Sequence, residues 1–274
     1  MDAAALPEPN DGPPDWLRRP VRPDLAGFVD DIVFYRETGV PMVGRVEAAS
    51  LTVPLVISFA APFSIALGRT PHRGDAIASF AAGLFAGPVV MDSPGSAECV
   101  QVNFTPAGAL RFFGLPLSEI ADAMVTLDDL GDRAISGLRE RLGAEPDPAR
   151  RLDRVEAFVL ARIRAGAPAD PEIAWAYRRI VETGGRVRIA GLAEEIGCSR
   201  KHLFARFRRD IGLAPKTVAR MARFQGALAL SSRIAAPDWA DVAAACGYAD
   251  QAHLTREFAE MAGASPAAWL RRAA

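Results

Sequence analysis

The chain has 274 residues, half of them apolar, which is enough for two domains with well-packed cores. It contains no run of about 20 apolar residues and no N-terminal signal pattern, so the sequence predicts no membrane association and a cytoplasmic location. The three cysteines, Cys99, Cys198 and Cys246, lie far apart and form no CxxC pair, so we expect free thiols and no disulfide framework.

The formal net charge of −1 conceals an uneven distribution. From residue 171 to the end there are 16 basic and 10 acidic residues, whereas the preceding part has 16 basic and 23 acidic residues. A basic C-terminal part beside an acidic N-terminal part is typical of a chain with an anionic partner for one domain. Charge alone is equally compatible with an uneven surface that has no partner.

The first 20 residues contain five prolines and show no periodicity, and they are interpreted as a flexible N-terminal arm. Residues 21–105 contain short apolar or alternating runs separated by glycine and proline. This pattern predicts a small β-barrel or sandwich. The clearest runs are at residues 40–49, 51–60, 86–91 and 100–104.

After Pro106 the apolar spacing becomes helical. The segment 165–171 (AGAPADP) is interpreted as a linker, which leaves a β-rich domain at 21–165 and a helical domain at 171–274. The helices predicted at the end of the first domain cover residues 108–113, 117–123, 134–142 and 147–165.

The strongest signal is an internal repeat within the helical domain. Ala193 and Gly197 recur as Ala243 and Gly247, 50 positions later. With one residue added in the second turn, the remaining matches are 51 positions apart. These pairs are His202 and His253, Leu203 and Leu254, Phe207 and Phe258, Gly212 and Gly263, and Pro215 and Pro266.

Each copy predicts a helix, a glycine turn and a second helix, capped by Ser199 or Asp250. Such helix-turn-helix units, expected at 188–212 and 238–263, place their second helix in the major groove of DNA. One long helix at 215–232 would hold them at a fixed separation. The alternative is that the two helical hairpins serve only for packing against protein. Five basic residues within 200–209 instead favour contacts with phosphates.

The second copy, through residues 247–251, 253–258 and 263–266, resembles the AraC/XylS family of transcription regulators, and Arg223 and Ala227 also fit the family pattern. The resemblance covers about 100 of the 274 residues. It implies a sequence-specific regulator of transcription that reads two successive major grooves of double-stranded DNA.

The resemblance also implies which residues contact DNA. Bases would be read by Arg200, Lys201 and Phe204 in the first copy, with Ala205 where many family members have arginine. In the second copy the base readers would be Gln251, Ala252, His253 and Arg256. The full candidate set is Ser199, Arg200, Lys201, Phe204, Arg206, Arg208, Arg209, Asp250, Gln251, Ala252, His253 and Arg256.

Residues 102–109 and 114–116 resemble a segment of regulators with a cupin-like N-terminal domain. The expected fold is therefore α+β: an N-terminal cupin-like β-barrel with a helical appendage, followed by an all-α double helix-turn-helix domain. The N-terminal domain would modulate DNA binding by binding a small molecule or by dimerisation. The alternative is a pure oligomerisation or protein-interaction module.

We expect no enzymatic activity and no metal or other cofactor, because His72 is the only histidine outside the repeat and no nucleophile or phosphate-loop motif is present. Candidate partners besides DNA are a small-molecule effector, a second copy of the chain and RNA polymerase. The aromatic residues that would line an effector pocket are Phe34, Tyr35, Phe59, Phe63, Phe80 and Phe85.

Overall fold

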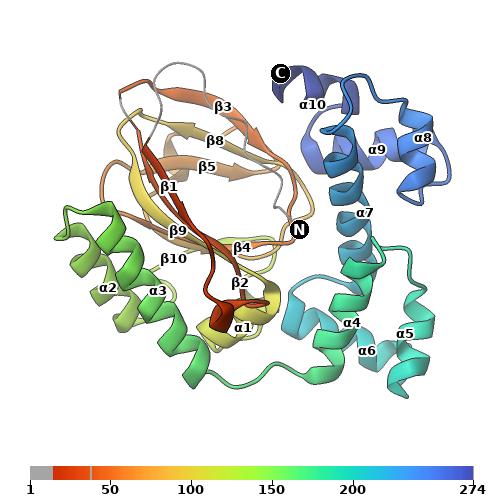
Figure 1. Cartoon of the computed structure of the whole chain (residues 1–274), viewed down its shortest axis with the longest axis horizontal. Coiled ribbons are helices and arrows are strands. Elements are labelled where there is room, and N and C mark those ends of the chain that lie inside the picture. The colour runs from red at the N-terminus through yellow and green to blue at the C-terminus, as the bar shows by residue number, and fades with distance from the viewer. Residues whose placement is uncertain (1–14, 38, 274) are drawn as a thin grey trace.

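The computed structural model describes residues 15–37 and 39–273. Two β-sheets with attached helices form the N-terminal part, and the C-terminal part is helical and lies along one side of the sheets (Figure 1). In the described part of the chain, none of the helices has both the length and the apolar character needed to cross a bilayer. The predicted α+β architecture is confirmed.

The first sheet has six strands in the order β1-β2-β9-β4-β7-β10, with all neighbours antiparallel. The second has four strands in the order β3-β8-β5-β6. The two remain separate sheets instead of closing into one barrel. The strands are β1 Asp15–Arg19, β2 Val29–Arg36, β3 Met42–Glu47, β4 Val53–Ser58, β5 Phe63–Leu67, β6 Ala76–Ile77, β7 Phe80–Ala82, β8 Val89–Ser93, β9 Glu98–Phe104 and β10 Met124–Thr126.

The start of the chain differs from the predicted arm. Asp15–Arg19 forms strand β1, which pairs with β2 from Asp15 opposite Arg36 to Arg19 opposite Ile32. Pro20 follows the last residue of this strand, where a residue without an amide donor ends the pairing. The remainder of the predicted arm, residues 1–14, lies outside the described residues.

Helices cover the outer face of the six-stranded sheet (Figure 1), and the core between them continues into the C-terminal helices. They are α1 Pro106–Phe113, α2 Arg133–Gly143 and α3 Pro148–Ala165, with the short 3₁₀ turns η1 Pro23–Leu25, η2 Arg73–Asp75 and η3 Leu117–Glu119. The helix predicted at 117–123 is only the turn η3. Asp122, with φ of 55°, is in the left-handed region, which an α-helix cannot continue through.

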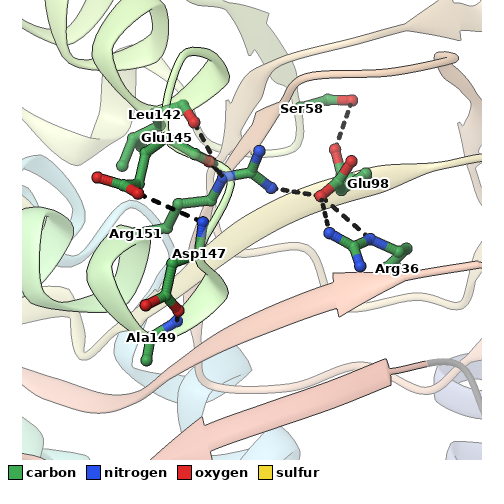
Figure 2. Close-up of polar contacts among 8 residues, drawn as sticks. All are labelled: Arg36, Ser58, Glu98, Leu142, Glu145, Asp147, Ala149 and Arg151. Carbon is green, nitrogen blue, oxygen red and sulfur yellow. Dashed lines mark hydrogen bonds and ion pairs between the residues drawn. The ribbon is translucent and has the colours of Figure 1, made fainter.

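A buried arginine connects the helices to this sheet. Arg151 on α3 forms an ion pair with Glu98 on β9, and its Nε donates to the Leu142 carbonyl at the end of α2 (Figure 2). Arg36 on β2 binds the same carboxylate at 2.8 Å. Burial alone would raise the pKa of Glu98, but its two arginine partners hold that pKa below the ordinary value. The carboxylate therefore stays charged and joins β2, β9 and α3.

The C-terminal part consists of short helices arranged around one long helix, α7 (Figure 1). Residues 166–170 separate α3 from α4, and Asp170 caps the start of α4. The helices are α4 Pro171–Glu182, α5 Ile189–Ile196, α6 Arg200–Ile211, α7 Pro215–Ser231, α8 Trp239–Ala245, α9 Gln251–Ala262 and α10 Pro266–Ala273.

We predict that Gly108→Ala destabilises the chain by about 1–3 kcal/mol, although alanine is the better helix former. A Cβ at this position in α1 would lie 1.8 Å from the Phe28 carbonyl oxygen, which accepts a hydrogen bond from the Thr105 amide. Urea unfolding measures the change. The control is Gly143→Ala at the end of α2, where a Cβ meets nothing within 4 Å. It should gain stability, and an equal effect of both substitutions would contradict the steric explanation.

Candidate nucleic-acid interface

The two repeat units have the same turn geometry. In the first unit the Cys198 amide donates to the Ala193 carbonyl at 3.0 Å, and Gly197 adopts φ of 75°. In the second, the Tyr248 amide donates to the Ala243 carbonyl at 2.9 Å, and Gly247 adopts φ of 78°. This six-to-one hydrogen bond around a left-handed glycine ends the first helix of each unit and sets the direction of the second.

The cores of the two units also correspond. The alanines of the turn-preceding helices, α5 and α8, are buried, as are the leucine and phenylalanine of the following helices, α6 and α9. One side of each second helix is therefore fixed against the domain, and the other side faces solvent. The matched buried pairs are Ala193 and Ala243, Leu203 and Leu254, and Phe207 and Phe258.

Helix α7 lies between the units and packs against both. Its Phe224 ring meets Phe258 of α9 at 5.0 Å, and Arg220 Nε donates to the Glu257 carboxylate at 2.7 Å. Arg223 of α7 lies over the Tyr248 ring at 5.6 Å and donates to the Gly185 carbonyl at 3.1 Å. The repeat gave no signal for these contacts, which fix the second unit on α7.

The exposed face of α6 carries cations in its first turn and its last turn. Arg200, Lys201 and Arg208 are exposed, and within the described part of the chain none of them has an acidic partner. Phe204 lies on the same face, one turn after Arg200 and one turn before Arg208. Four candidate residues are thus brought together on one accessible face.

Two other candidate arginines on α6 are already paired within the chain. Arg206 Nε donates to Asp170 at 3.0 Å and its Nη1 to Glu172 at 2.6 Å, and its side chain is only 21% exposed. Arg209 Nε donates to the neighbouring Asp210 at 2.6 Å. Their charges are neutralised by carboxylates, so the structure gives Arg206 a role in attaching α6 to the start of α4. Its partner lies 36 residues away in sequence, which explains why the sequence did not reveal it.

Three further candidates have roles in the fold of their own unit. Ser199 Oγ accepts the His202 amide hydrogen at 3.2 Å, and Asp250 Oδ1 accepts that of His253 at 2.6 Å, so both cap the second helix of their unit. The His253 ring is half-buried, packs edge-on against Tyr248 and lies 3.4 Å from Glu257. On α9, the candidates with exposed side chains are Gln251, Ala252 and Arg256.

The six aromatic candidates for an effector pocket do not face one space. Phe34 and Phe59 lie on the helix side of the six-stranded sheet, where the Arg151 guanidinium covers both rings. Tyr35, Phe63 and Phe80 pack between the two sheets. Phe85 is half-buried near Gly68 and Gly87. Because adjacent residues of a strand point to opposite faces, Phe34 and Tyr35 cannot line the same pocket.

Both units contact the N-terminal part at the same position, the glycine that follows the second helix. A Cβ at Gly212, after α6, would lie 3.1 Å from the Leu117 carbonyl oxygen of η3. A Cβ at Gly263, after α9, would lie 3.3 Å from Pro88. In addition, the Ala49 amide donates to the Met261 carbonyl at 2.8 Å, and Gln225 of α7 donates to the Ala49 carbonyl. The sequence contained no signal for this docking.

We predict that Arg206→Gln lowers the free energy of unfolding by about 1–2 kcal/mol, because it leaves the half-buried Asp170 without its cation. Burial raises the pKa of Asp170, but hydrogen bonds from Arg206 outweigh this and hold it below its ordinary value. The stabilisation is therefore present at neutral pH and is lost as the pH falls through that lowered pKa. Thermal unfolding at pH 7 and at about pH 3 measures both effects.

The matched control is Arg208→Gln, two positions along the same helix, where the exposed side chain has no acidic partner among the described residues. Its stability should stay within about 0.5 kcal/mol of the original at both pH values. Equal losses for the two variants would show that the Arg206 ion pairs do not hold α6 in place.

Comparison with known proteins agrees with the geometry of the two units. Residues 192–272 match the family described as a helix-turn-helix domain. No curated protein sequence matches the chain significantly. Among solved structures, ToxT from Vibrio cholerae has a TM-score of 0.46 and 10% identity over 88% of this chain and 98% of its own.

Two further structures are similar to smaller parts of the chain. The C-terminal domain of AraT, a response regulator from Geobacillus stearothermophilus, has a TM-score of 0.36 and 19% identity over 39% of this chain and 88% of its own. The AraC-like transcriptional activator CuxR has a TM-score of 0.29 and 15% identity over 77% of this chain and 78% of its own. Because these TM-scores are low, the identification of a helix-turn-helix domain in the C-terminal part depends on the family match and on the local geometry.

Proposed function

We infer that this chain, whose C-terminal part is a helix-turn-helix domain of the AraC type, is a sequence-specific regulator of transcription that reads two successive major grooves of double-stranded DNA. The observation that carries the inference is the exposed face of α6. There Arg200, Lys201 and Arg208 have no acidic partners in the described chain, in contrast to Arg206 and Arg209. Unpaired cations on the exposed face of a recognition helix are available for phosphates and guanines.

The separation of the units supports reading by both helices. Helix α7 has 17 residues, which corresponds to a length of about 25 Å, and the units stack along it (Figure 1). The grooves on one face of DNA repeat about every 34 Å. Units fixed at the two ends of α7 can therefore approach successive grooves with modest bending of the duplex.

We propose that the N-terminal part modulates this reading. It contacts both units at the glycine that follows the recognition helix, Gly212 and Gly263, so a change in its shape would act on both units together. A small molecule bound by the N-terminal part or a second copy of the chain could supply that change. The alternative is that this part serves only for association with other proteins.

The test is fluorescence anisotropy of a labelled duplex from the region upstream of the gene, titrated with full-length protein over a salt series. We expect binding that exceeds binding to a scrambled duplex and that weakens steeply with salt. Substitution of Arg200, Lys201, Arg208 and Arg256 by glutamine should weaken binding and reduce the slope of log affinity against log salt by about 0.9 for each phosphate contact removed.

The control is Arg141→Gln, an exposed arginine on α2 of the N-terminal part, which should leave both affinity and slope unchanged. Equal affinity for the two duplexes would argue against sequence-specific reading. Unchanged binding by the fourfold variant would show that the faces of α6 and α9 do not contact DNA.

A separate prediction concerns the docking of the two parts. Gln225→Glu should loosen it, because a carboxylate would face the Ala49 carbonyl to which Gln225 now donates. We expect faster hydrogen exchange at the Ala49 amide, which is bonded to Met261, while the strands of the six-stranded sheet stay protected. Gln251→Glu, the same change at an exposed position on α9, is the control and should leave this exchange unchanged. If Gln225→Glu has no effect on the amide, Gln225 does not hold the interface.

A further inference from the structure

Phe204 is a large apolar side chain at the centre of the basic face of α6. Its side chain is 45% exposed, whereas Leu203 and Phe207 on the same helix are buried. Phe204 lies one helical turn from Arg200 and one turn from Arg208, and Lys201 is on the adjoining edge of the face. An aromatic ring is therefore surrounded by cations that have no acidic partner in the described chain.

The fold does not account for this ring. Among the described residues, Phe204 makes no aromatic or cation–π contact and belongs to none of the buried clusters. Single exposed apolar residues are common on protein surfaces and need no explanation. Phe204 differs because it lies in the first half of a recognition helix, the part that meets base edges when such a helix enters the major groove.

The residue after Phe204 cannot form a side-chain hydrogen bond with a base. Ala205, which is also exposed, has no hydrogen-bonding group, and it lies about 100° around the helix from Phe204. The cations Lys201 and Arg208 lie between these two positions, and Arg200 lies on the other side of Phe204, where they can bind phosphates or guanine. In the second unit, Thr255 and Arg256 lie 51 positions after Phe204 and Ala205, and the exposed Arg256 can pair with guanine through two hydrogen bonds.

The apolar group that a base pair presents in the major groove is the C5-methyl of thymine. From this we propose that the first unit selects thymine through contact between its C5-methyl group and Phe204. The proposal deepens the function inferred above and rests on it. The two units then have the same fold but read different chemistry, apolar contact in the first and hydrogen bonding in the second.

The experiment begins with a randomised duplex library from which full-length protein selects its preferred sites. The preferred duplex is then synthesised with uracil, which lacks only the methyl group, in place of one thymine at a time. We expect one or two positions within one half of the site where uracil weakens binding by about three- to tenfold. At those positions Phe204→Ala should bind the thymine and uracil duplexes equally, and Phe204→Leu should retain part of the preference.

The control variant is Ile234→Ala, which truncates another exposed apolar residue of the same domain, 42% exposed and outside the recognition helices. It should retain the full preference for thymine. Because Phe204 is exposed, we expect its variants to keep the Tm of the original protein, which can be measured directly.

Two results would overturn the proposal while leaving the proposed function intact: tight binding with no position sensitive to uracil, or an equal loss of affinity for both duplexes in Phe204→Ala. Failure to select any sequence from the library would instead remove the proposed function, and the proposal with it.

Discussion

The burial of one side of α7 is the constraint on which the C-terminal part depends. Its residues Val218, Met221, Phe224 and Ala227 are fully buried, and they provide the common core against which both helix-turn-helix units pack. Neither unit buries enough apolar surface to be stable as an isolated pair of short helices. Because a single continuous helix supplies the core of both, the second helices of the two units cannot rotate independently without loss of that burial.

The basic residues of the C-terminal part fall into two groups, those that are paired with carboxylates and those that face solvent. Arginines that face carboxylates, such as Arg206 and Arg220, fix helices to one another, whereas Arg200, Lys201 and Arg208 are left in solvent. The same residue type therefore serves both stability and recognition, and its role is decided by whether an acidic partner lies within reach. Net charge alone did not separate these roles. Exposure and pairing separate them residue by residue.

The sequence signals of the two repeat units are local ones: glycine turns, capping residues and the prolines that begin α7 and α10. The structure has α5 and α6 between Ile189 and Ile211, and α8 and α9 between Trp239 and Ala262, where the units were expected at 188–212 and 238–263. The N-terminal part was harder. Strand β2 is buried on both faces and shows no alternation, so its pattern does not indicate a strand. The pairing of Arg206 and the separation of Phe34 from Tyr35 depend on tertiary contacts and strand orientation.

The contact between Ala49 and Met261 joins two main-chain groups, and Gln225 binds the other main-chain group of Ala49. Side-chain identity at positions 49 and 261 therefore has little direct bearing on it. Among relatives, these positions can diverge while the contact persists, so co-variation between them would not reveal the interface. Loop length is a different matter. A single residue inserted between β3 and β4 would move this peptide group out of register, so the interface constrains the length of that loop more than its sequence.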